Sequence, residues 1–132
     1  MSPEVGFVTF LGLTLVLLGV VVATGLAARR RVHLVAVALA VVSLGTTIYH
    51  AERMGDLYDL AAAGSITPVH LAIAKLTTLA YLAPVVTGVL TIRDARWRPR
   101  HRLVAFVVLA MTVATAVTGT WMVLAAPRLA GV

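Results

Sequence analysis

Four long apolar runs, separated by short polar segments, dominate the hydropathy pattern of this chain of 132 residues. The runs cover residues 6–28, 32–53, 68–92 and 101–126. About 20 predominantly apolar residues suffice for a helix to cross a bilayer. The apolar positions do not alternate with polar ones as in the strands of a membrane barrel, so the pattern favours helices. We therefore predict an all-α fold, an integral membrane four-helix bundle that forms a single domain over residues 1–132.

Basic residues gather at the ends of these runs and predict an orientation. Arg53 and Arg128 lie toward one membrane face, whereas eight arginines lie toward the other, namely Arg29, Arg30, Arg31, Arg93, Arg96, Arg98, Arg100 and Arg102. Lys and Arg accumulate in cytoplasmic loops. We therefore expect both arginine-rich loops to be cytoplasmic and both termini to be extracytoplasmic. This arrangement describes a multi-pass protein of the inner (plasma) membrane.

Composition narrows the classes of function. The mean hydropathy of +1.01 and the 61% share of hydrophobic residues leave no room for a separate soluble domain. The absence of cysteine excludes disulfides, thiolate metal sites, iron–sulfur clusters and covalent c-type haem. The net charge of +6 sits at the helix ends, so the expected partner is the lipid bilayer and not a nucleic acid. The first run has no basic segment before it, and we expect it to be a retained span.

Four histidines lie near the ends of the predicted helices and carry the candidate chemistry. In the predicted topology His33 and His101 share the cytoplasmic face, while His50 and His70 share the other. Imidazole can ligate a metal through one ring nitrogen while a hydrogen bond holds the other. Successive residues turn by about 100°, so His33 and His50 can face different helices, the fourth and the third. Two pairs at two depths predict haem or metal sites, and we expect the outer pair to be the main one.

A weak repeat links the third and fourth runs. Thr87-Gly88 begins 17 positions after His70, and Thr118-Gly119 begins 17 positions after His101. Because neighbouring helices of the bundle are antiparallel, Gly88 comes level with His101 and Gly119 comes level with His70. Small residues let membrane helices approach closely, and packing is the first interpretation of these pairs.

A second interpretation is that glycine admits a flat macrocycle close to the backbone. A threonine hydroxyl beside it could bond an imidazole N–H. Thr24-Gly25 in the first run is similarly level with His33.

Charged residues extend this hypothesis. Lys75 lies inside the third run, one to two turns from His70, and an ionisable residue at that depth is a functional candidate. It could equally extend its ammonium group to the membrane surface. Arg100 and Arg102 could meet the propionates of a haem. We expect haem b, with copper or no cofactor as alternatives. No residues combine a nucleophile, a base and an orienting partner, so a redox role would be that of a b-type electron carrier.

The motifs around the histidines resemble those of the CtaM/YozB-like four-helix membrane proteins. The matching features are Arg31-Val32-His33, Tyr49-His50, His70-Leu71-Ala72, His101-Arg102, Ala105 and Thr118-Gly119. The chain departs from the family's pattern at Leu34, where Arg is usual, and in the middle of the last run, which lacks a proline. The resemblance implies association with haem-copper oxidases and their maturation, with the four histidines as haem or metal ligands.

These observations predict a membrane protein with paired histidine sites that acts in respiratory oxidase assembly or electron transfer. Its expected partner is a larger respiratory membrane complex or an oxidase subunit. The alternative is a cofactor-free structural or accessory subunit of a larger membrane complex. A quinone-linked electron-transfer protein is a third possibility.

Overall fold

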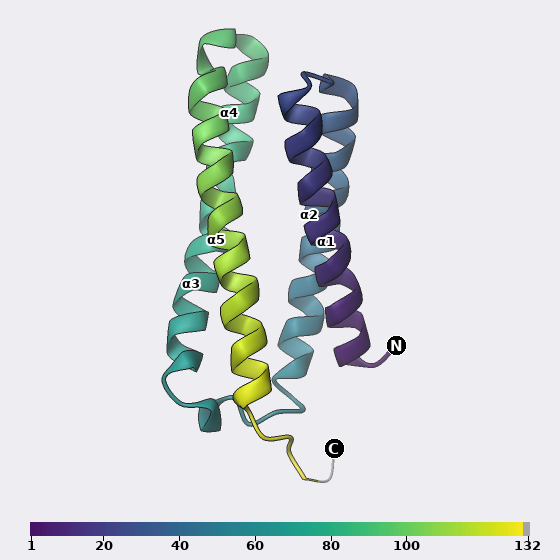
Figure 1. The fold of residues 1–132 in the computed structure, drawn as a ribbon, viewed down its shortest axis with the longest axis vertical. Coiled ribbons are helices and arrows are strands. Elements are labelled where there is room, and N and C mark those ends of the chain that lie inside the picture. Colours follow the sequence, from purple (N-terminus) through teal and green to yellow (C-terminus); the bar gives the residue numbers. More distant parts are fainter. Residues whose placement is uncertain (131–132) are drawn as a thin grey trace. The chain divides into compact units, whose positions relative to one another are not determined.

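A computed structural model of the chain describes residues 1–130 and is helical throughout its regular structure, apart from one isolated bridge between Tyr58 and Arg128. Four helical segments are long and apolar enough to cross a membrane (Figure 1): Pro3–Leu26, Arg30–Met54, Ile66–Arg93 and Ala95–Ala125. The all-α prediction is confirmed, and the helices start and end within a few residues of the apolar runs. The predicted domain ends at Val132, which lies outside the described residues.

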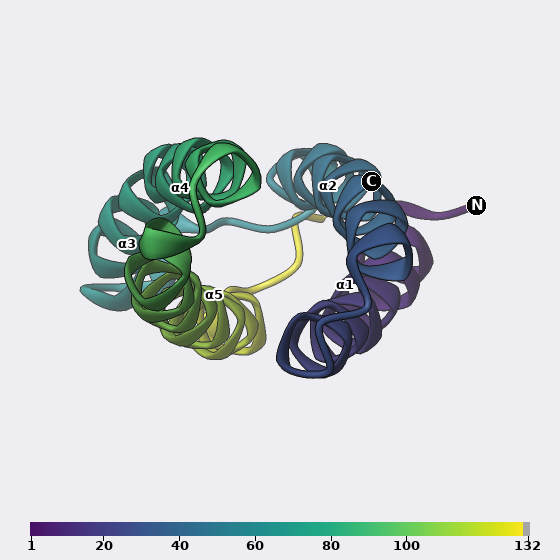
Figure 2. The same ribbon diagram turned by 90° about the horizontal axis from the view of Figure 1, so that it is seen from above.

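The helices form two compact units, each a helical hairpin. The first hairpin comprises residues 1–58 and the segment from Arg128 onward, and it contains α1 (Pro3–Leu26) and α2 (Arg30–Met54). The second hairpin comprises residues 59–127. It contains η1 (Ala61–Ala63), α3 (Ile66–Ala80), α4 (Leu82–Arg93), η2 (Ala95–Trp97) and α5 (Arg98–Ala125). Within each unit the helices run side by side and antiparallel, as both views show (Figure 2).

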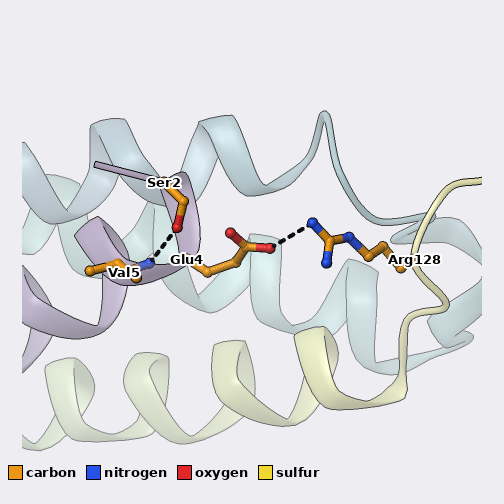
Figure 3. Close-up of polar contacts among 4 residues, drawn as sticks. All are labelled: Ser2, Glu4, Val5 and Arg128. Carbon is orange, nitrogen blue, oxygen red and sulfur yellow. Dashed lines mark hydrogen bonds and ion pairs between the residues drawn. The ribbon is translucent and has the colours of Figure 1, made fainter. Parts of the chain in front are cut away.

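Polar residues fix the beginning of α1 (Figure 3). The hydroxyl of Ser2 accepts a hydrogen bond from the backbone N–H of Val5 at 3.3 Å, and Pro3 occupies the first turn, where no N–H is needed. Glu4 complements the positive end of the helix. Its carboxylate also forms an ion pair with Arg128 at 3.2 Å, which ties the segment after α5 to the start of α1.

The turn between α1 and α2 is short because a left-handed residue follows closely after the end of α1 at Leu26. Ala28 has a φ of 55°, a conformation usually taken by glycine. The backbone N–H of Arg29 donates to the carbonyl of Thr24, and that of Ala28 donates to the carbonyl of Gly25. These bonds satisfy the last carbonyls of α1 and turn the chain directly into α2.

Small and hydroxyl-bearing residues form the interface of the first hairpin. On α2 the buried positions recur along one helical face: Ala36, Ala40, Ser43, Thr47 and Met54. Thr14 of α1 is 1% exposed, and its hydroxyl lies 2.8 Å from that of Ser43 and 3.2 Å from that of Thr47. Small side chains let the backbones approach, and hydroxyl pairs supply interhelical hydrogen bonds.

Pro84 interrupts the helix that the third apolar run forms. Proline has no N–H and its ring collides with the carbonyl four residues earlier, here that of Ala80. α3 accordingly ends at Ala80, and α4 begins at Leu82. At the break, the hydroxyl of Tyr81 lies 2.7 Å from that of Thr112 on α5. The span predicted over residues 68–92 therefore consists of two helices, α3 and α4, joined at a bend.

Candidate functional site

Each of the four histidine rings lies against a glycine of its own hairpin. A Cβ added at Gly6 would overlap the ring of His50, and one added at Gly119 would lie 2.8 Å from Cε1 of His70. At Gly25 and Gly88 it would lie 3.2 Å and 3.3 Å from Cε1 of His33 and His101, respectively. Since each histidine is half-buried against a backbone, these glycines set how closely the helices approach.

The imidazole ring of His70 on α3 contacts α5 through one edge as well as through its face. Its Nδ1 lies 3.0 Å from the hydroxyl of Thr118, the residue before Gly119. The same hydroxyl donates to the carbonyl of Ala114, one turn earlier on α5, at 2.8 Å. The dipeptide therefore provides both the space for the ring and a polar contact for one of its nitrogens.

His101 of α5 meets the same arrangement on α4. Its Nδ1 lies 3.1 Å from the hydroxyl of Thr87, the residue before Gly88. This hydroxyl donates to the carbonyl of Ala83 at 2.7 Å. The antiparallel register that the repeat predicts for Gly88 and Gly119 is thus the register of the second hairpin.

His33 of α2 has two oxygen neighbours on α1. Its Nδ1 lies 3.0 Å from the backbone carbonyl of Val21 and 3.4 Å from the hydroxyl of Thr24. Thr24 in turn donates to the carbonyl of Val20 at 2.7 Å. Because a carbonyl oxygen only accepts hydrogen bonds, Nδ1 of His33 is a donor.

The imidazole of His50 on α2 packs against apolar neighbours that residue spacing alone did not predict. The ring stacks on Phe10 with centroids 5.7 Å apart and an interplanar angle of 12°, and Tyr49 meets its edge. Val5, and not a threonine, precedes Gly6. Within residues 1–130 no hydrogen bond of the His50 imidazole is formed. The antiparallel register that pairs Gly25 with His33 places Gly6 within two positions of His50, so the register could have identified this glycine.

Within one hairpin, the two histidines are too far apart to share a ligand atom. His33 and His50 are 17 positions apart on α2, or about 25 Å at 1.5 Å per residue. His101 is 18 positions from Gly119, which contacts His70, so that pair is separated by about 27 Å. A site with two histidine ligands therefore requires a second hairpin.

The predicted pairing of His50 with His70, and of His33 with His101, joins the two units and stays a prediction. So does the expectation that His33 faces the fourth span and His50 the third. Inside the first hairpin, both rings contact α1.

Charged residues are distributed unequally between the hairpin ends. We call the ends that carry the short turns, with His33 and His101, the closed ends, and those with His50 and His70 the open ends. At the open ends Arg53 pairs with Asp56 at 3.6 Å, and Arg128 pairs with Glu4. Among the described residues, the eight closed-end arginines, Arg102 included, form no ion pair. Cationic side chains without an acidic partner among the described residues therefore lie at the closed ends, and one of them, Arg100, lies over the ring of Trp97.

Lys75 is not brought to His70. The two residues are five positions apart on α3, which corresponds to about 140° around the helix. Lys75 is exposed and has no hydrogen bond or ion pair among residues 1–130.

Within the part of the chain that the structure describes, no group of three or more His, Asp or Glu side chains is close enough to hold a metal ion. Zinc sites usually take three or four protein ligands, whereas haem iron needs at most two axial ones. Each imidazole lies against a glycine and could supply one ligand nitrogen.

Comparison with protein-family models, curated proteins and solved structures finds no match to this chain. The resemblance to the CtaM/YozB-like proteins therefore rests on the histidine and Thr-Gly motifs alone.

Proposed function

We propose that the chain is a multi-pass protein of the inner (plasma) membrane with both termini on the extracytoplasmic side. Four helices of sufficient length and apolarity support the membrane location. The eight arginines at the closed ends support the orientation, since such residues are retained in the cytoplasm.

We further propose that the four histidines would hold haem b, in the pairs that the sequence predicts, His50 with His70 and His33 with His101. The observation that carries this proposal is that every imidazole packs against a glycine at one end of its hairpin. Three of the rings also have Nδ1 bonded to an oxygen, as in metal-ligating histidines generally. Bound haem would supply one-electron transfer, and the closed-end arginines would neutralise its propionates.

The family resemblance extends this proposal to a partner. It favours a role beside a respiratory haem-copper oxidase, either in assembly or as an electron-carrying accessory. The eight closed-end arginines, which form no ion pair among the described residues, support His33 and His101 as a haem pair at least as suitable as the outer pair preferred from sequence.

A cofactor-free structural subunit is the second candidate, and one observation favours it. Each ring already fills the space above its glycine, and three have hydrogen-bond partners inside their own hairpin. A histidine that only packs two helices together would be satisfied by these contacts.

An optical spectrum of the purified protein separates the two candidates. We expect split α and Soret bands on reduction, typical of haem b with two histidine ligands. His→Ala changes should remove haem in pairs, with equal losses for His50 and His70 and for His33 and His101. Thr78→Ala serves as the control, because this exposed hydroxyl bonds only within α3. Unchanged haem in all four variants, or a wild-type protein without haem, would leave the structural role.

A further inference from the structure

Three of the four histidines contact the same short motif, a Thr-Gly dipeptide on the neighbouring helix of their own hairpin. We propose that Thr87 and Thr118 are positioning residues that hold His101 and His70 in the Nδ1–H tautomer, and that the carbonyl of Val21, assisted by Thr24, does the same for His33. Nε2 is then the nitrogen that carries the lone pair for a metal. The identity of the ligand rests on the proposed function, whereas the tautomer does not.

The argument follows the single hydroxyl proton of Thr118. Its oxygen lies 2.8 Å from the carbonyl of Ala114 and 3.0 Å from Nδ1 of His70. The carbonyl can only accept, so the proton lies between the two oxygens and the threonine oxygen accepts from Nδ1–H. In the reverse arrangement two oxygens would face each other at 2.8 Å without a proton. Away from water such an unmade bond is costly.

The other two sites repeat this geometry. The hydroxyl of Thr87 donates to Ala83 at 2.7 Å, so its oxygen accepts from Nδ1 of His101 at 3.1 Å. At His33 the conclusion does not depend on a hydroxyl, because the carbonyl of Val21 lies 3.0 Å from Nδ1. Three independent contacts therefore give the same tautomer.

The two residues of the dipeptide have separate tasks. Glycine gives the ring room to lie against the helix, and threonine bonds the ring's Nδ1 edge, which limits its rotation. A neutral imidazole has one N–H, so a donor at Nδ1 leaves the lone pair on Nε2. A hydrogen bond that fixes the tautomer in this way also raises the basicity of a metal-ligating histidine.

His50 is the exception that makes the inference specific. Gly6 is preceded by Val5, which offers no hydroxyl, and Phe10 orients the plane of the ring without contacting a ring proton. Within residues 1–130 nothing fixes which nitrogen of His50 is protonated. We therefore expect His50 to differ from the other three histidines.

Solid-state NMR tests the tautomers in protein labelled with ¹³C,¹⁵N-histidine and reconstituted in bilayers without added haem. Spectra are recorded about two pH units above the titration of free imidazole, so that the rings are neutral. We expect Nδ1–H signals from His33, His70 and His101, assigned with single His→Gln variants. His50 should show the Nε2–H form or a mixture.

The threonine is tested by Thr118→Val, which keeps its shape and removes the hydroxyl. We expect the His70 signal to lose its pure Nδ1–H character and Thr118→Ser to restore it. Thr120→Val is the matched control, since Thr120 bonds only to Ala116 of its own helix. An Nε2–H signal for His70 in the wild type, or an unchanged signal in Thr118→Val, would overturn the inference. Correct tautomers in a protein that never binds haem would overturn the proposed function alone.

Discussion

The two hairpins place a histidine ring on a glycine at each end, but only the second does so in the same way twice. At its closed and open ends the glycine follows a threonine whose hydroxyl contacts the imidazole. In the first hairpin the closed end has this threonine, whereas the open end has Val5 and an aromatic stack on Phe10. Packing a ring against a backbone thus requires glycine, while orienting its nitrogens requires a hydrogen-bond acceptor beside the ring, either a hydroxyl or a backbone carbonyl.

The centres of the hairpins also differ. α1 and α2 are continuous helices joined by a buried cluster around Thr14. The second hairpin bends at Pro84, and the hydrogen bond between Tyr81 and Thr112 lies at the bend. A second bond, between Thr77 and Thr115 at 3.0 Å, lies one turn from it. The centre of the first hairpin therefore depends on a buried cluster of three hydroxyls, and that of the second on two separate hydroxyl pairs near the bend.

The largest expected effect on stability is that of replacing a glycine that contacts a histidine ring with alanine. Gly6→Ala and Gly119→Ala force the ring of His50 or His70 out of place and should lower the free energy of unfolding by up to about 2 kcal/mol, because overpacking usually costs about 1–3 kcal/mol and alanine returns about 1 kcal/mol of helix propensity. Gly25→Ala should be close to neutral, because its Cβ needs a shift of only a few tenths of an ångström and alanine gains about 1 kcal/mol in helix propensity. Denaturant titration of the helical signal in mixed micelles measures each variant.

Glycines without a neighbour provide the controls. A Cβ at Gly12 or Gly45 would meet open space, so alanine there should not destabilise the hairpin. Equal effects at Gly6 and Gly12 would show that the histidine contact does not limit the approach of the helices.

A smaller loss of stability is expected when a hydroxyl that bonds between helices is removed from the middle of either hairpin. Thr14→Val removes a hydroxyl with two interhelical partners and should cost about 1 kcal/mol, whereas Tyr81→Phe removes one bond and should cost about 0.6 kcal/mol. The same titration measures both. Thr46→Val is the control, because that hydroxyl bonds only to Val42 of its own helix. A larger loss for Tyr81→Phe would reverse the proposed difference between the hairpins.

The smallest expected change in stability comes from replacing the left-handed residue in the turn of the first hairpin. Ala28→Gly relieves the left-handed strain of about 1–2 kcal/mol but adds freedom to the unfolded chain, so a net gain of about 0.5 kcal/mol is expected. Ala27→Gly is the control, because Ala27 has a φ of −77° and gains nothing from glycine. Thermal unfolding in detergent compares the two. Stabilisation by both changes would mean that the left-handed turn is not the cause.

Much of the second hairpin could be predicted from residue spacing. The 17-position intervals from His70 and His101 to the Thr-Gly pairs place each histidine beside the other helix's glycine, and the structure has those contacts. The break at Pro84 was open to prediction too, since proline removes a helical hydrogen bond wherever it stands. The span predicted over residues 68–92 corresponds to the helical segment Ile66–Arg93, although hydropathy does not register the bend within it.

Hydropathy and the period of the helix are local properties of the sequence. They were enough to predict four membrane-length helices, the approximate ends of these helices and the antiparallel register that brings glycines beside histidines. The tertiary structure decided what each ring touches. Phe10 and Gly6 became the neighbours of His50, and the Val21 carbonyl became the partner of His33, through the angle at which α1 packs on α2. Such contacts depend on rotation and crossing of two helices, which side-chain packing sets and no spacing within one helix encodes.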